Sequence, residues 1–125
     1  MEKPGKKVLI VDDDSRNIFA LSAVLRSKGY PCTSSLTVSD AVELLKHDTG
    51  IGIILMDMMM PDMDGYEAIP QIKGMTEAEH LPIIAVTAQA MKGDRERCLP
   101  AGADGYIAKP VDVDALVSLL QQQIG

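Results

Sequence analysis

Short apolar runs recur along the chain, and longer polar segments separate them. Three of these runs, at residues 8–11, 51–56 and 82–86, are nearly continuous and rich in β-branched side chains. A continuous rather than alternating apolar pattern indicates strands that are buried on both faces, as in a parallel sheet covered by helices. Residues 106–108 form a fourth, shorter apolar run, and residues 32–35 are a weaker candidate whose polar side chains fit an edge strand. The pattern therefore predicts five short strands.

Between the runs, apolar residues spaced three or four apart predict helices. Ile18, Leu21 and Leu25 form the first stripe, with Asp14 as a start signal and Gly29 as a stop. The later stripes are Ala41, Leu44 and Leu45 after Thr37, then residues 91–99, then Val113, Leu116, Val117 and Leu120 after Asp112. A further helix is expected after Gly65.

A strand followed by a helix thus occurs five times. Alternation of this kind gives a parallel sheet with right-handed crossovers and helices on both faces. The predicted fold is therefore α/β, doubly wound and flavodoxin-like: a five-stranded parallel sheet of order 2-1-3-4-5, flanked by five helices. We expect residues 1–125 to form a single domain.

Charge and composition exclude several kinds of partner. The formal net charge is −6 and no basic cluster occurs beyond Lys6 and Lys7, which argues against direct binding of nucleic acid or an anionic membrane. No apolar run approaches the roughly 20 residues that a membrane-spanning helix needs, so no membrane insertion is expected. Cys32 and Cys98 fit neither a metal site nor a redox motif and are expected to be reduced thiols. A cytoplasmic location is expected.

Binding sites in open parallel sheets form where the strands end. The polar residues at these ends are Asp12 and Asp13 after the first strand, Asp57 after the third, Thr87 after the fourth and Lys109 after the fifth. Carboxylates that are brought together repel one another, and a divalent cation removes this repulsion. Mg2+ suits the set best because it takes oxygen ligands and commonly accompanies phosphate.

Asp57 could be either a ligand of this cation or a nucleophile. As a nucleophile, a carboxylate attacks phosphorus and becomes an acyl phosphate. The oxygens of a transferring phosphoryl group carry negative charge. The Thr87 hydroxyl and the Lys109 ammonium are suited to binding these oxygens.

Four segments, in order and at matching spacing, make the chain resemble the receiver domain of two-component response regulators. They are residues 8–13, residues 56–61 with 63–65, residues 82–88, and residues 101–106 followed by Lys109 and Pro110. The resemblance covers essentially the whole chain. Residues 88–98 resemble the receivers of hybrid histidine kinases more than receivers fused to DNA-binding domains. The chain could therefore be a stand-alone regulator or a receiver of a hybrid histidine kinase.

The resemblance implies a role for each residue of the acidic set. Asp57 would accept a phosphoryl group from the phosphohistidine of a histidine kinase or a histidine phosphotransfer protein. Asp13 would hold Mg2+ directly, Asp12 largely through water, and the backbone carbonyl of Met59 would be a further ligand.

It also implies the parts of a switch. Thr87 and Lys109 would bind the phosphoryl oxygens, and Tyr106 would swing inward as Thr87 moves. Output would be binding of another protein, and a homodimer through the last two strand–helix units is left open. Apart from its own phosphorylation and dephosphorylation, no enzymatic activity is expected.

Simpler interpretations apply to some of the residues. Asp12, Asp13 and Asp14 could cap the first helix, because carboxylates favour a helix N-terminus. We expect this of Asp14 only. The methionines around Asp57 are expected to make apolar contacts, and His47 and His80 to lie on the surface.

Four positions depart from the simple pattern. Pro70 lies several residues beyond Gly65, so the helix there either starts late or is kinked, and Pro100 raises the same question near 91–99.

Met59 and Gln89, each two residues after a proposed site residue, are expected to influence the lifetime of the acyl phosphate. Because Met59 cannot orient a water by hydrogen bonding, we expect slower self-dephosphorylation than in Met59→Asn.

Two other functions compete with the signalling switch. A haloacid-dehalogenase-type phosphatase also uses an Asp nucleophile and Mg2+, but it needs an acid–base Asp where this chain has Met59. A flavodoxin needs a phosphate-binding loop after the first strand, where Asp12 and Asp13 would repel phosphate. It also uses aromatic side chains around the flavin, and aromatic residues make up only 3% of the chain.

Overall fold

The computed structural model describes residues 7–48, 50–58, 65–76, 81–87, 104–108 and 113–124. Five strands form one parallel sheet in the order β2-β1-β3-β4-β5, which confirms the predicted topology. The strands are β1 (Lys7–Val11), β2 (Cys32–Ser35), β3 (Ile51–Asp57), β4 (Ile83–Thr87) and β5 (Gly105–Ala108). The described helices are α1 (Ser15–Ser27), α2 (Val38–His47), α3 (Gly65–Lys73) and α5 (Val113–Ile124). The helix predicted at 91–99 lies outside the described residues.

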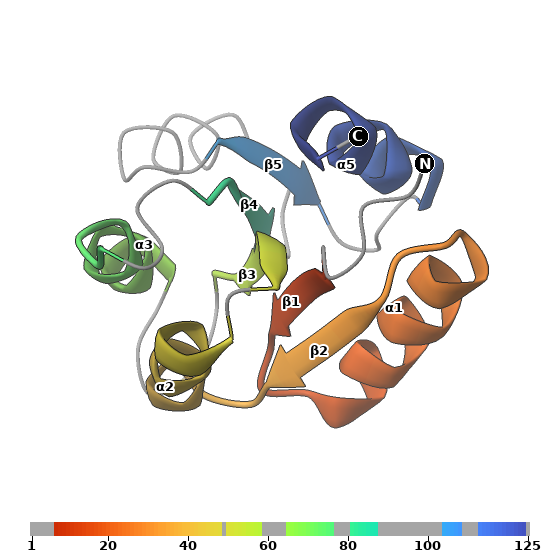
Figure 1. Cartoon of the computed structure of the whole chain (residues 1–125). Coiled ribbons are helices and arrows are strands. Elements are labelled where there is room, and N and C mark those ends of the chain that lie inside the picture. Colours follow the sequence, from red (N-terminus) through yellow and green to blue (C-terminus); the bar gives the residue numbers. More distant parts are fainter. Residues whose placement is uncertain are drawn as a thin grey trace.

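The helices cover both faces of the sheet. Helices α1 and α5 lie on one side of it, and α2 and α3 lie on the other (Figure 1). The central strand β3 is buried along its whole length, as its continuous apolar run predicted. Its side chains divide between two apolar clusters, with Ile54 and Met56 in the α2–α3 layer and Ile53 and Leu55 in the α1–α5 layer.

The predicted helical stripes supply the facing half of each layer. Leu21 and Leu25 of α1 and Leu116 and Leu120 of α5 are buried in one cluster. Ala41 and Leu45 of α2 are buried in the other, together with Ala68, Ile69 and Ile72 of α3. Burial of aliphatic side chains on both faces stabilises the sheet by about 25 cal/mol for each Å² removed from water.

Side-chain caps fix where two of the helices begin. The Asp14 carboxylate accepts a hydrogen bond from the Arg16 N–H at 3.0 Å, so the prediction that Asp14 is an N-cap is confirmed. The Thr37 hydroxyl accepts one from the Asp40 N–H at 3.1 Å. Gly29 follows the end of α1 with φ +94°, a backbone conformation that residues with a Cβ atom rarely adopt. The two caps mark where α1 and α2 begin, and Gly29 allows the chain to turn after the end of α1.

Pro70 lies inside α3, which begins at Gly65 and continues to Lys73. The alternative of a late helix start is therefore wrong. Pro70 cannot donate a hydrogen bond to the preceding turn, but Ala68, Ile69 and Ile72 of the same helix are buried. The packing of these three side chains offsets the missing bond. Pro100 lies outside the described residues.

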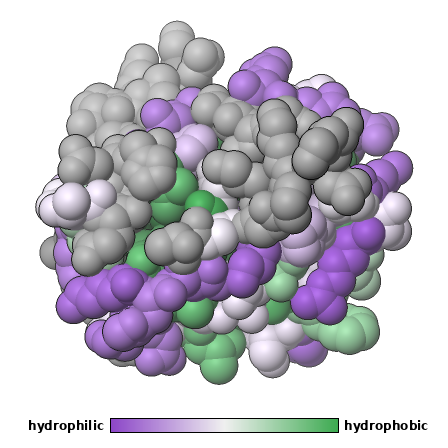
Figure 2. All heavy atoms as spheres, viewed as in Figure 1, coloured by the Kyte–Doolittle hydropathy of each residue, from purple (hydrophilic) through white to green (hydrophobic). Residues whose placement is uncertain are grey.

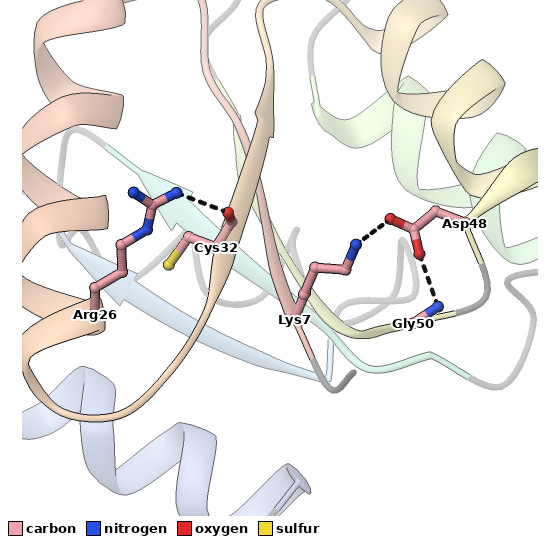
Figure 3. Close-up of polar contacts among 5 residues, drawn as sticks. All are labelled: Lys7, Arg26, Cys32, Asp48 and Gly50. Atoms are coloured by element: carbon pink, nitrogen blue, oxygen red, sulfur yellow. Dashed lines mark hydrogen bonds and ion pairs between the residues drawn. The ribbon is translucent and has the colours of Figure 1, made fainter. Parts of the chain in front are cut away.

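Polar contacts hold together the edge of the sheet at which the strands begin, here called the amino edge. The Lys7 ammonium at the start of β1 donates to the Asp48 carboxylate after α2 at 2.5 Å, and Asp48 also accepts from the Gly50 N–H at 2.8 Å (Figure 3). The Arg26 guanidinium donates to the Cys32 carbonyl at 3.2 Å. These bonds tie α1 and the α2–β3 connection to the sheet.

A second polar cluster joins α3 to β4 and β5. The Lys73 ammonium donates to the Leu81 carbonyl at 2.9 Å and to the Asp104 carboxylate at 2.8 Å. The same carboxylate accepts from the Ile83 N–H at 2.9 Å, while the Asp104 N–H donates to the Ile83 carbonyl at 2.7 Å. Asp104 thus fixes the register at the point where β4 and β5 begin.

The described surface is largely hydrophilic in the view of Figure 2, with smaller hydrophobic areas between. Large apolar side chains that stand exposed are Phe19 on α1 and Leu36 before α2. Exposed His47 lies 3.3 Å from Glu43, which confirms its prediction as a surface residue. Among the described residues, no helix is both long and apolar enough to cross a membrane.

Candidate functional site

Asp12 and Asp57 stand at the opposite edge of the sheet, where the strands end; this is called the carboxyl edge below. Asp12 directly follows β1, and Asp57 is the last residue of β3. The two strands are neighbours, with Val11 paired to Met56. Parallel pairing therefore brings together two carboxylates that are 45 positions apart in the sequence.

Asp13 completes a cluster of three carboxylates. One carboxylate oxygen from each of Asp12, Asp13 and Asp57 can be chosen so that all three atoms lie within 4.8 Å of one another. Asp12 and Asp57 are buried, at 3% and 4% exposure, whereas Asp13 is exposed. The predicted acidic residues are thus brought together, with one of them open to solvent.

This donor set fits Mg2+. All three groups offer oxygen atoms, which are the ligands that hard divalent cations prefer. Three carboxylates this close repel each other, and burial of two of them weakens the screening by water. A divalent cation between them would remove that repulsion, and the exposure of Asp13 leaves room for the waters that Mg2+ retains.

Two donors from the start of α1 hold the Asp12 carboxylate. The Asp14 N–H donates to Oδ1 and the Asn17 side-chain amide donates to Oδ2, each at 2.9 Å. The sequence reasoning did not identify Asn17. Its position five residues after Asp12 is the signal that could have identified it. A residue in the first turn of a helix can reach back to the end of the strand that precedes the helix.

Asp14 has a different role from its neighbours. Its carboxylate caps α1, and the hydrogen bond from the Arg16 N–H lowers the pKa of this side chain below the ordinary value. Asp14 does not belong to the cluster of three carboxylates. Asp14 therefore caps the helix, as predicted, and stands apart from the two residues before it.

The end of β4 lies beside the end of β3. Asp57 pairs with Val86, and the Met58 N–H donates to the Val86 carbonyl at 2.9 Å. Thr87 is the next residue and the last of β4, which places its backbone at the carboxyl edge. The side chains of Thr87 and Tyr106 lie outside the described part of the chain, as do Met59 and Lys109.

The sheet order is that of an α/β protein, with three clustered carboxylates at the carboxyl ends of β1 and β3. A model of the response regulator receiver domain matches residues 8–121. The chain belongs to this family and is a receiver domain of two-component signalling. Phosphorylation on aspartate and Mg2+ binding are general properties of such domains. The haloacid-dehalogenase-type alternative gains no support.

Individual relatives agree with this assignment. The polar-differentiation response regulator DivK of Brucella ovis is 33% identical over 120 residues, which are 96% of this chain and 97% of DivK. The receiver domain of sensor histidine kinase PA1611 from Pseudomonas aeruginosa, solved with magnesium in its active-site cleft, is 39% identical with a TM-score of 0.83. That match covers 97% of this chain and 98% of the solved one.

A third relative was solved together with a partner. It is the receiver domain of the Saccharomyces cerevisiae response regulator Ssk1, in complex with the histidine phosphotransfer protein Ypd1. The similarity is 27% identity with a TM-score of 0.85, covering 98% of this chain and 91% of the solved chain. Receivers with this fold thus include one that binds a phosphotransfer protein.

Proposed function

We propose that this protein is a signalling switch in which Asp57 accepts a phosphoryl group. The observation that carries the proposal is the position of Asp57, buried at the end of the central strand with carboxylate oxygens of Asp12 and Asp13 within 4.8 Å. The phosphodonor is the phosphohistidine of a histidine kinase or a histidine phosphotransfer protein. The phosphorylated state then binds an output protein differently.

The hydrogen bonds around Asp12 suit a carboxylate that holds a cation. Its two oxygens accept bonds from the Asp14 N–H and from the Asn17 side-chain amide at the start of α1. In the transfer, an Asp57 oxygen forms a bond to phosphorus while the bond from phosphorus to the donor histidine nitrogen breaks. The electron pair of that bond stays on the imidazole nitrogen, and the ring leaves as neutral imidazole because its other nitrogen carries a proton or because the departing nitrogen takes one up from water.

The remaining residues neutralise charge. Asp12, Asp13 and the Met59 carbonyl would hold Mg2+, which supplies positive charge beside the phosphoryl oxygens. The Thr87 hydroxyl would donate to one of these oxygens, and the Lys109 ammonium would pair with another. Phosphoryl transfer depends mainly on positioning and charge, which these groups would supply.

Strand pairing offers a route from the site to the surface. Thr87 pairs with Ala108, and Ala85 pairs with Tyr106, so β4 and β5 are in contact along their length. Movement of Thr87 toward the phosphoryl group would displace the paired residues of β5. Tyr106, the proposed switch residue, lies on that strand. A ligand shifts such an equilibrium only as far as it binds the two states differently, and the phosphoryl group would supply that difference.

The resemblance to the receiver of PA1611 favours a place in a phosphorelay. That receiver belongs to a sensor histidine kinase and shares 39% of its residues with this chain. A stand-alone regulator remains the other arrangement, as in DivK. Phosphotransfer in both directions with a histidine phosphotransfer protein would indicate a relay member.

Mass spectrometry of the intact protein tests the proposal. After incubation with Mg2+ and acetyl phosphate or phosphoramidate, we expect a gain of one phosphoryl group that is absent in Asp57→Asn. Asp14→Asn is a matched control because this cap residue lies outside the acidic cluster. Incorporation that persists in Asp57→Asn would exclude Asp57 as the acceptor. Absence of incorporation from every donor, with Mg2+ still bound, would exclude the switch.

A further inference from the structure

Asn17 links the start of α1 to the acidic cluster. Its side-chain amide donates to Asp12 Oδ2 at 2.9 Å, while the Asp14 N–H donates to Asp12 Oδ1 at the same distance. The two bonds reach different oxygens of one carboxylate. Together they fix both the position of the Asp12 carboxyl group and its rotation about the last side-chain bond.

The surroundings of Asp12 make such a restraint necessary. Asp12 is only 3% exposed, and one of its carboxylate oxygens lies within 4.8 Å of a carboxylate oxygen of Asp13 and of Asp57. Repulsion from two neighbouring carboxylates favours rotation of Asp12 away from them when no cation is present. Hydrogen bonds to the charged form counteract that tendency.

The chemistry of the donor matters as well. Asn17 donates from a neutral amide, so it holds Asp12 without cancelling any of the negative charge of the cluster. A Lys or Arg at this position would donate equally well but would compete with a cation for the carboxylates. The structure thus combines a fixed carboxylate with an undiminished attraction for a divalent ion.

We propose that Asn17 is a positioning residue for the cation site, which presents the Asp12 carboxylate in the orientation that Mg2+ requires. This inference rests on the proposed function and adds a residue to that same site. Residues that hydrogen-bond to a metal ligand typically contribute 10–100-fold to metal affinity. Because Asp12 is one of three carboxylates, we expect an effect of about tenfold, at the lower end.

Two substitutions and a direct titration with Mg2+ test the role. Asn17→Leu keeps the approximate volume but removes the donor, and isothermal titration calorimetry should show Mg2+ binding about tenfold weaker. Asn17→Gln keeps an amide and should lose less. In the unaltered protein, the NMR signal of the Asn17 side-chain amide should move as Mg2+ is added, a measurement that needs no variant. Equal Mg2+ affinity in Asn17→Leu and the parent would overturn the inference.

A control on the same helix separates positioning from helix stability. The Ser27 hydroxyl donates to the Val24 carbonyl at 2.6 Å, at the end of α1 away from the acidic cluster. Ser27→Ala removes a side-chain hydrogen bond from α1 without touching Asp12, and its Mg2+ affinity should equal that of the parent. An equal loss in Ser27→Ala and Asn17→Leu would show that general weakening of α1 is the cause, against the inference.

Phosphorylation kinetics supply a second readout. With acetyl phosphate as donor, the Mg2+ concentration that gives half the maximal rate should rise about tenfold in Asn17→Leu, with little change in the maximal rate. A lower maximal rate at an unchanged half-saturating concentration would overturn the inference. If the parent itself bound no Mg2+, both the proposed function and the inference on Asn17 would fail. If the parent binds Mg2+ and is phosphorylated while Asn17→Leu matches it throughout, only the inference on Asn17 fails.

Discussion

At the scale of single residues, carboxylates of this protein serve three different purposes because their neighbours differ. Asp57 and Asp12 are buried beside other carboxylates, which makes them suited to a cation. Asp14 faces backbone N–H groups and begins a helix. Asp48 accepts from an ammonium group at the amino edge of the sheet. Residue type alone does not distinguish these roles, but the donors around each carboxylate do.

The pH dependence of the Asp48 interaction can be worked out from its surroundings. The hydrogen bond from Lys7, and then that from the Gly50 N–H, lower the pKa of the Asp48 carboxyl below its ordinary value. A carboxylate with a lowered pKa stabilises the folded state above the pKa of the unfolded chain, about 3.9. This contribution is lost as the pH falls through the lower, folded pKa.

Urea unfolding of the parent and of Asp48→Asn should show this behaviour. We expect the difference in free energy of unfolding to be constant between about pH 5 and 7 and to shrink below about pH 4. Lys7→Met should give a similar profile, because it removes the hydrogen bond that contributes most to the lowered pKa of Asp48. A difference that grows as the pH falls would contradict the assignment.

At the scale of elements, α3 shows how packing overrides local preference. Proline in a helix interior costs about 3 kcal/mol relative to alanine, yet α3 runs through Pro70 because Ala68, Ile69 and Ile72 are buried against the sheet. The helix therefore depends on its tertiary contacts more than on its sequence.

Replacement of the proline should strengthen this helix. Pro70 is exposed, so Pro70→Ala removes no core contact and restores a donor to the preceding turn. After allowance for the greater freedom of the unfolded chain, we expect the free energy of unfolding to rise by about 1–2 kcal/mol. Urea titration measures the change, with Gln71→Ala, the exposed next residue, as a control near zero. Destabilisation by Pro70→Ala would mean that the proline is required for the path of the chain.

At the scale of the whole molecule, side-chain contacts hold the amino edge of the sheet at the starts of β4 and β5. Lys73 and Asp104 connect α3 with the starts of β4 and β5 through four hydrogen bonds among side chains and backbone. The carboxyl ends of the same strands lie beside Asp57. A change at Asp57 is therefore expected to move the ends of β4 and β5 while their starts stay in place.

Amide hydrogen exchange with and without phosphorylation would locate that movement. We expect the largest changes in protection near Val86, Thr87 and Ala108, and smaller changes near Ile83 and in β2. Leu119 of α5 lies beside the Gly105 position of β5, which makes α5 the next element expected to respond. Asp57→Asn treated with the same donor is the control. Changes confined to α2 and β2 would contradict this route.

The sequence by itself determined the order of the elements and the sheet topology. Continuous apolar runs mark strands buried on both faces, helical stripes mark the layers, and the two together leave few arrangements. It also located the acidic set, because parallel strands end at one edge and Asp12 and Asp57 directly follow buried runs. These features depend on local pattern and connectivity, which a sequence contains in full.

Only the tertiary structure decided which neighbours each side chain meets. The pairing of Lys7 with Asp48 and the passage of α3 through Pro70 depend on how the layers pack. The sequence left open whether the helix around Pro70 starts late or bends, because proline disfavours the interior locally while burial of the neighbouring side chains favours it. Interactions between residues far apart in the chain carry no periodic signal, and their energies decide such conflicts.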